Sequence, residues 1–141
     1  DKERKHWTVH SAIVIKLLIK KTLFHCNNNG YPFASINLKN SKIIDKNVHL
    51  DVELNLGPLI IVDSIITPPS INNQKRIIEQ IINIHPGDIF NQELINAIST
   101  RIKETPYLIE VKAPEYEFIN NKVILFVNAK NKPVILIAPS F

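Results

Sequence analysis

The stretch that decides the fold is NVHLDVEL (Asn47–Leu54), which returns later in the chain as KVILFVNA (Lys122–Ala129). Apolar residues at every second position match between the two copies, at an offset of about 75 residues. The same offset aligns Gly57-Pro58-Leu59 with Lys132-Pro133-Val134, and Tyr31-Pro32-Phe33 with Pro106-Tyr107-Leu108. An internal repeat decides the architecture before any local motif does, so the sequence indicates two copies of one small module.

The composition is sufficient for such modules to form hydrophobic cores, and it argues against a few other classes of protein. The chain has 141 residues, of which 45% are hydrophobic, and a formal net charge of +4. No dense Lys/Arg block with interleaved aromatic residues occurs, so nucleic-acid binding gains little support. The single cysteine, Cys26, excludes a disulfide within the chain. The apolar run Ser11–Phe24 contains three lysines and is shorter than the ~20 residues that span a bilayer, so no transmembrane helix is predicted.

The first copy predicts a helix followed by a strand hairpin. Residues from about Trp7 to Cys26 contain no Gly or Pro and are largely apolar around the helix, and Asn27–Gly30 ends them. Phe33–Lys39 and Val48–Leu56 alternate between two faces, which predicts a sheet covered on one face and wet on the other. Because the first strand and first helix of the module are missing here, or only touched by Asp1–His6, we expect this apolar helix to lack part of its cover.

The second copy predicts the complete order β-α-α-β-β. Leu59–Ile66 is a strand, and a helix capped by Ser70 or Asn72 continues to about Asn83. Asn91 caps the next helix, whose apolar stripe is Leu94, Ile95, Ile98 and Ile102, and Pro106 ends it. Tyr107–Glu117 and Lys122–Lys130 form the last hairpin, with a turn at Asn120-Asn121.

Several short motifs occur in a fixed order along the chain. Gly30-Tyr31-Pro32-Phe33 lies between a predicted helix and the next strand, and Gly57-Pro58 leads into another strand. Gly87-Asp88-Ile89-Phe90 lies at the turn between two predicted helices, and Pro106-Tyr107 follows the second helix. Together these motifs give the chain a resemblance to POTRA (polypeptide-transport-associated) domains of BamA/TamA-like outer-membrane assembly factors, the bacterial surface antigen family, in which Gly57-Pro58 looks like the start of a following domain. The second copy departs from the pattern by having Thr105 in place of a Gly matching Gly30.

The resemblance implies an α+β fold of tandem β-α-α-β-β modules, each a three-stranded mixed sheet with two helices on one face. It divides the chain into a partial module at residues 1–57, truncated at its N-terminus, and a complete module at residues 58–132. Residues 133–141 would begin a membrane β-barrel or a linker. It also implies a periplasmic location as part of an outer-membrane protein.

Candidate catalytic and metal-binding groups form no convincing set in the sequence. His6 and His10 have the i, i+4 spacing of a zinc site, but no third ligand is evident. Cys26 follows His25 directly, and neighbouring helix residues point about 100° apart, which is unsuitable for a nucleophile and its base. Asp51 and Glu53 share the strand face opposite the apolar one, where a solvated surface is expected. The sequence therefore predicts no enzyme activity, no cofactor, no metal and no small-molecule substrate.

The remaining chemistry is that of strand edges. The strand after the second helix is an edge strand in the resembled family, which corresponds to Ala34–Lys39 and Leu108–Lys112 here. An edge offers unpaired backbone groups to which an extended polypeptide can add as a further strand. The predicted contact residues are Ala34, Ile36, Leu38, Leu108, Ile109 and Val111; the alternative is that these edges are solvated or covered by a neighbouring module.

The predicted function is a periplasmic binding or scaffold segment of an outer-membrane protein assembly or translocation factor. Its partners would be unfolded outer-membrane proteins or accessory assembly proteins, beside the attached barrel. One alternative is a rigid spacer without client binding. Another is a small nucleic-acid-binding α+β domain, which would need exposed aromatic residues on the sheet and a basic cluster; the aromatic residues in predicted strands are Phe33, Tyr107, Tyr116 and Phe126.

Overall fold

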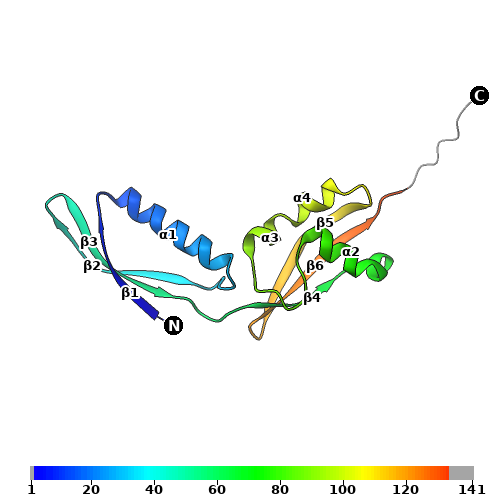
Figure 1. Cartoon of the computed structure of the whole chain (residues 1–141), viewed down its shortest axis with the longest axis horizontal. Helices are drawn as coiled ribbons and strands as arrows, with labels where there is room; N and C mark the ends of the chain where they lie inside the picture. Colours follow the sequence, from blue (N-terminus) through cyan, green and yellow to red (C-terminus); the bar gives the residue numbers. More distant parts are fainter. Residues whose placement is uncertain (1, 134–141) are drawn as a thin grey trace, which may run out of the picture.

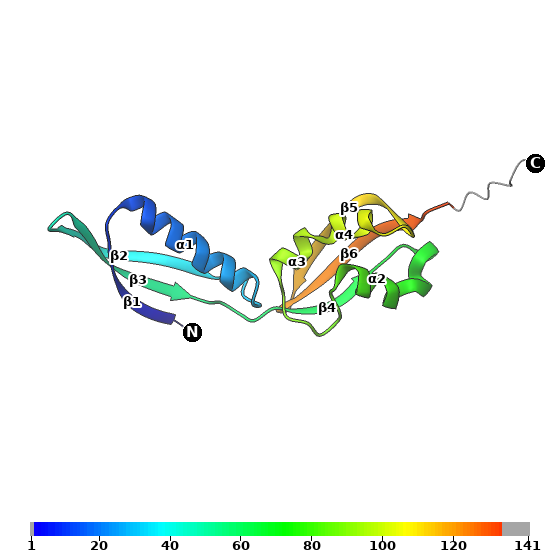
Figure 2. The same cartoon turned by 45° about the horizontal axis from the view of Figure 1, so that its top comes forward.

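Two three-stranded sheets, each with its own helical cover, follow one another along the chain (Figure 1). The computed structural model describes residues 2–133, and the predicted barrel start or linker lies almost wholly outside these residues. The two units lie end to end rather than stacked, in both views of the molecule (Figures 1 and 2). This arrangement confirms the predicted α+β class and the repeat.

The N-terminal unit consists of β1 (Lys2–Val9), α1 (Ala12–Asn27), β2 (Ser35–Ile44) and β3 (Asn47–Asn55). Its strand order is β1-β3-β2. The predicted helix start at Trp7 is wrong, because Lys2–Val9 pairs with β3 as a strand. The helix starts only after Ser11, whose hydroxyl accepts a hydrogen bond from the Val14 N–H at 3.5 Å.

The C-terminal unit consists of β4 (Ile61–Ile66), the 3₁₀ turn η1 (Pro69–Gln74), α2 (Lys75–Ile82), α3 (Gln92–Asn96), α4 (Ile98–Glu104), β5 (Leu108–Ile119) and β6 (Lys122–Asn131). Its strand order is β4-β6-β5. Neither Ser70 nor Asn72 caps a helix as predicted, because the Pro68-Pro69 pair starts a 3₁₀ turn there instead. The Asn91 cap is confirmed: its side chain accepts from the Leu94 N–H at 3.1 Å.

The two sheets differ in strand direction. In the C-terminal sheet β4 is parallel to β6 and β5 is antiparallel, which is the predicted mixed sheet. In the N-terminal sheet both β1 and β2 are antiparallel to β3, so the mixed pattern does not extend to it. The number of helical segments between the first two strands of each unit explains the difference. The single helix α1 brings the chain back to the sheet end at which β1 began, so β2 runs in the same direction as β1. The helical segments between β4 and β5 bring the chain to the opposite sheet end, so β5 runs against β4. The first strand predicted to be missing is thus replaced by β1, which runs in the opposite direction.

The two units have very unequal cores. Sixteen buried apolar residues form one cluster between the C-terminal sheet and its helices. The corresponding cluster of the N-terminal unit contains only Val9, Leu50 and Val52, with four partly buried neighbours. Cys26 is the only buried residue of α1, and Ile13, Leu17 and Phe24 are 71%, 53% and 58% exposed. This confirms the expectation that the apolar helix lacks part of its cover.

Candidate functional site

Both predicted edge strands lie at the edges of their sheets. β2 is the last strand in the order β1-β3-β2, and β5 is the last in β4-β6-β5. The pairing of β2 with β3 shifts register between Lys39 and Lys42, and β5 has two such shifts, between Glu110 and Lys112 and between Lys112 and Glu115. Bulges of this kind interrupt the regular row of backbone groups that an added strand needs. Strand addition at β2 or β5 stays a prediction.

The predicted contact residues have different surroundings along these edges. Ile36 and Leu38 pair with Leu54 and Val52, so they lie on the face that α1 covers, and Leu38 is 44% exposed. Ala34 precedes β2, since the strand starts at Ser35. In β5, Leu108 is buried in the core, whereas Ile109 and Val111 are exposed. An added strand would therefore meet apolar side chains at these edges, although Leu108 itself is inaccessible.

Two further edges, β1 and β4, were not singled out by the sequence. The edge of β4 is occupied at the start of the strand: Val62 N–H donates to the Asp88 carbonyl, Phe90 N–H donates to the Ile60 carbonyl, and Gly87 N–H donates to the Val62 carbonyl, all at 2.8 Å. The segment 87–90 therefore runs along the first residues of β4 and shortens the edge that is left for binding. The sequence carries little signal for β1: residues 2–6 are all charged or His, and the apolar Trp7 and Val9, which alternate with Thr8, fell inside the predicted helix.

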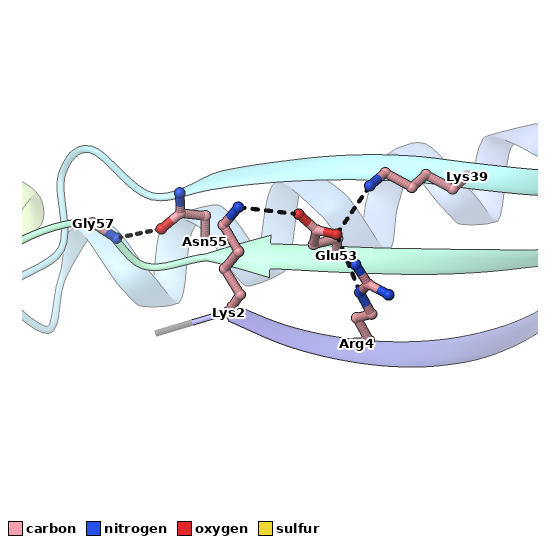
Figure 3. Close-up of polar contacts among 6 residues, drawn as sticks. All are labelled: Lys2, Arg4, Lys39, Glu53, Asn55 and Gly57. Carbon is pink, nitrogen blue, oxygen red and sulfur yellow. Dashed lines mark hydrogen bonds and ion pairs between the residues drawn. The ribbon is translucent and has the colours of Figure 1, made fainter.

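A charged cluster occupies the sheet face of the N-terminal unit that lies opposite α1, here named the open face. Glu53 on β3 is contacted by Lys39 Nζ at 3.1 Å, by Arg4 Nε at 3.3 Å and by Lys2 Nζ at 3.7 Å (Figure 3). Its side chain is only 7% exposed, so the predicted solvated position is wrong for this residue. The stems of long side chains cover Glu53, and their charged ends keep its surroundings polar.

This arrangement stabilises the ionised form of Glu53. The hydrogen bond from Lys39 is the largest cause that holds the pKa of Glu53 below its ordinary value, and the charges of Lys39, Arg4 and Lys2 add to it against the opposing effect of desolvation. The pKa of Asp51 is lowered in the same way, first by a hydrogen bond from Asn40 and then by one from His6. The open face therefore contains two firmly ionised carboxylates beneath a surplus of cations.

The predicted metal and nucleophile candidates are not brought together. His6 contacts Asp51 at 3.1 Å and His49 at 3.4 Å, whereas His10 bonds to Asn47 at 2.9 Å. Within residues 2–133 no group of three or more His, Cys, Asp or Glu side chains could hold a metal ion. Burial raises the pKa of Cys26, so its thiol stays protonated at neutral pH and is a poor nucleophile.

The loop after α1 forms a joint between the two units. Gly30 N–H donates to the Phe90 carbonyl at 2.9 Å, and Ile60 N–H donates to the Gly30 carbonyl at 2.8 Å. Asn28 Oδ1 accepts from the Glu93 N–H at 2.9 Å, so a residue of the N-terminal unit helps to cap α3 of the C-terminal unit. These bonds bind the backbone of one unit to that of the next.

Aromatic rings also pack against one another in the joint, next to these hydrogen bonds. The Phe33 ring meets the Phe118 ring edge-on, with centroids 4.8 Å apart, and Phe118 in turn contacts Phe90 and Tyr116. Gly57, with φ of +69°, lies against the Phe33 backbone where the chain leaves β3. The motif around Gly30–Phe33 and the motif around Gly87–Phe90 were predicted separately as markers of one module each. The structure brings them together across the boundary.

Of the comparisons with known proteins, the one with solved structures agrees with this architecture. No protein-family model matches the sequence, and no curated protein matches it. Among solved structures, BamA from Haemophilus ducreyi lacking POTRA domains 1–3 matches with a TM-score of 0.62 and 12% identity, over 86% of this chain and 24% of that one. The chain has a BamA-like POTRA fold. It spans about a quarter of the length of that BamA chain.

A second BamA structure is also similar to this POTRA-like chain. It is Haemophilus influenzae BamA POTRA3-5, with a TM-score of 0.47 and 19% identity, over 82% of this chain and 49% of that one. Among residues 2–133, none of the helices combines the length and the apolar character required to cross a membrane.

Proposed function

We propose that this chain is a pair of POTRA-like modules from a periplasmic scaffold of outer-membrane protein assembly or translocation. The observation that carries the proposal is the likeness to BamA together with two small sheets joined in series by specific contacts. We place the boundary between the modules at residues 57 and 58, where the chain leaves β3 for the joint. In this role the modules bind or position polypeptides, and catalysis has no part in it.

The binding chemistry we propose is addition of an extended client or accessory polypeptide to a sheet edge. Backbone hydrogen bonds supply an affinity that tolerates many client sequences, and the side chains flanking the edge supply preference. Within residues 2–133, each unit has at least one strand edge that no neighbouring strand covers. A scaffold with several such edges in series would hold one extended chain at more than one point.

This proposal is tested with ¹⁵N-labelled protein and an extended peptide taken from a membrane β-strand. Binding should shift backbone amide signals along one of the free edges, β1, β2 or β5. Shifts confined to α1–α4, or an absence of shifts at millimolar peptide, would contradict strand addition.

A rigid spacer is the second candidate, and the joint favours it. The hydrogen bonds of Gly30 and Asn28 and the Phe33–Phe118 contact would set the distance and angle of any distal partner. Replacing the C-terminal unit in the whole protein by an unrelated domain of equal length separates the two functions. A spacer keeps its activity after the exchange, whereas a client-binding module loses it.

The nucleic-acid alternative is not supported by the placement of the aromatic residues. Tyr116 pairs with Leu125 on the helix-covered face, and Phe126 pairs with Glu115 on the other face. Phe33 and Tyr116 are engaged in the aromatic contacts of the joint. The rings therefore form no common platform on which successive bases could stack.

A further inference from the structure

We propose that the free edge of β1 binds, by strand addition, an extended segment of another protein in which acidic residues alternate with apolar ones. The inference rests on the proposed function, and it names the edge and the chemistry of the partner. It is carried by the continuity of this edge and by the two different hollows that flank β1, one on each face of the sheet.

The edge of β1 is the most regular of the four sheet edges in the described part of the chain. Its eight residues pair with β3 in one unbroken register, from Lys2 opposite Asn55 to Val9 opposite Val48. The pairings of β2, β4 and β5 contain register shifts, and the segment 87–90 also occupies the start of β4. β1 is the terminal strand of its sheet and lies on the outer side of the unit in both views (Figures 1 and 2). An added strand needs such an uninterrupted row of backbone groups.

On the open face the edge presents surplus positive charge. Lys2 and Arg4 have side chains that are 66% and 78% exposed, and they share the single carboxylate of Glu53 with Lys39. Asp51, the second carboxylate of the open face, also lies within the influence of Arg4, so three cations and two carboxylates leave a surplus of one positive charge. Beside them is a hollow of about 270 Å³ lined by Arg4, Lys5, His6, Lys39, Asn40, Asp51, Val52 and Glu53.

A strand added to β1 would place every second side chain directly beside Lys2, Arg4 and His6. Cross-strand neighbours on one face lie about 5 Å apart at their Cβ atoms, which is within reach of an ion pair. Glu53 already fixes the Lys2 and Arg4 side chains near the sheet, so less side-chain entropy is lost when a partner carboxylate arrives. Acidic residues are therefore the side chains that fit this face.

On the other face the edge borders an apolar hollow between the sheet and α1. It has a volume of about 140 Å³ and is lined by Glu3, Lys5, Trp7, Thr22, Ile36, Val52 and Leu54. The small core of this unit does not fill the space at this side of the helix. The alternate side chains of an added strand would point toward it, and a side chain such as Val or Ile would bury apolar surface there.

A second copy of this chain is a poor occupant of the edge. The sequence of β1 contains Lys2, Arg4 and Lys5 against the single acid Glu3, a net charge of +2 before any histidine is counted. Two β1 strands side by side would bring like charges together, which destabilises strand pairing. Charge complementarity therefore favours an acidic segment of a different protein.

The test uses a ten-residue peptide in which Glu alternates with Val. Trp7 is the only tryptophan of the chain and lines the apolar hollow, so its fluorescence reports occupancy. We expect a saturable change in Trp7 emission, shifts of the amide signals of Lys2–Val9, and weaker binding at high salt because the ion pairs are screened. A peptide with Lys in place of Glu, and one with the same composition in two blocks, should both fail to bind.

Protein variants with matched charge separate the edge from general attraction. Lys2→Ser with Arg4→Ser should weaken binding between about threefold and thirtyfold, because two exposed ion pairs are lost. Lys42→Ser with Lys46→Ser removes the same charge away from β1 and should leave affinity within about twofold. Equal losses in both variants would overturn the assignment, because net charge alone would then explain the binding.

The remaining outcomes distinguish this inference from the proposed function. Amide shifts along β2 or β5 without shifts along β1 would overturn the β1 site and leave strand addition standing. No shift on any edge, for this peptide and for membrane-strand peptides, would overturn both. Only every second N–H of an added strand faces β1. A peptide N-methylated at those positions should not bind, whereas a peptide N-methylated at the alternate positions should bind. If both N-methylated peptides bind, strand addition is excluded. Self-association of the protein through β1, seen by sedimentation, would overturn the foreign partner.

Discussion

At the scale of single residues, Gly30 is the position with the least freedom to change. Its φ is +92°, and a Cβ there would lie 2.4 Å from Leu59 Cδ1. Gly87 has a nearly identical φ of +93°, but a Cβ there would meet nothing within 4 Å. Comparing substitutions at the two glycines therefore distinguishes the cost of the left-handed backbone, which both share, from the cost of steric overlap in the joint, which only Gly30 has.

We predict that Gly30→Ala lowers the free energy of unfolding more than Gly87→Ala does. Both substitutions force alanine into a left-handed conformation, at a cost of roughly 1–2 kcal/mol. Gly30→Ala must in addition turn Leu59 away from the joint, which should also shift the amide signals of Ile60 and Phe90. Urea unfolding followed by circular dichroism measures the difference. Equal losses in the two variants would show that the joint adjusts around a methyl group without cost.

Glu53 makes the N-terminal unit sensitive to acid. Its pKa is lower in the folded protein than in the unfolded chain, so between the two values the unfolded chain binds more protons. The stabilisation is therefore complete above the ordinary pKa of 4.5 and is lost as the pH falls through the lower, folded value. We predict that Glu53→Gln flattens the acid-side dependence of stability. Glu115→Gln, which removes an exposed pair with Lys112, should leave that dependence unchanged in melts recorded from pH 7 to pH 3.

At the scale of the helix, α1 presents an apolar surface that nothing in the described chain covers. Ile13 and Leu17 lie one turn apart and are mostly exposed, whereas Leu50 beneath the helix is only 1% exposed. We predict that Ile13→Gln with Leu17→Gln costs less than about 1 kcal/mol, because exposed positions contribute little to stability. Leu50→Ala should cost about 2–5 kcal/mol, as do other core truncations. Chemical denaturation compares the two; a large loss in the double variant would mean that α1 is covered in solution.

The sequence predicted most elements because their periodicity is strong. Val48, Leu50 and Val52 alternate over a full strand, and Asn91 provides the expected cap for α3. The prediction failed where local signals were ambiguous. Trp7 lies next to an apolar helical run, and only its pairing with Leu50, more than forty residues away, shows it to be in a strand. Tertiary pairing overrides local preference at such a position.

In the candidate site, too, the contacts of the joint depend on tertiary structure that local sequence signals do not show. Gly30 and Phe90 could be assigned to turns from the sequence, because each of the two motifs, 30–33 and 87–90, begins with glycine and ends with phenylalanine. Their contact across the boundary depends on the placement of two folded units, which no local pattern contains. Glu53 was similarly predictable as a residue of the polar face, but its burial depends on cations from β1 and β2.

At the scale of the whole molecule, the units should differ in stability because their cores differ in size. The buried cluster of the C-terminal unit contains sixteen apolar residues, and the buried cluster of the N-terminal unit contains three. We predict that amides of β3 exchange hydrogen faster than amides of β6, through partial unfolding that leaves the C-terminal unit intact. Native-state hydrogen exchange measures this. Equal protection of β3 and β6, with equal response to denaturant, would show that the units unfold as one.

The joint should hold the two units in one orientation even though their stabilities differ. The Asn28 side chain caps α3 across the boundary, whereas the Asn29 side chain bonds only to His25 of its own helix. We predict that one alignment tensor fits the residual dipolar couplings of both units, and that Asn28→Ala with Phe33→Ala makes the two tensors differ. Asn29→Ala is the matched control and should leave a single tensor, because it removes a local hydrogen bond alone. Two tensors already in the unaltered protein would refute the spacer role, since a flexible joint cannot set the distance or angle of a distal partner.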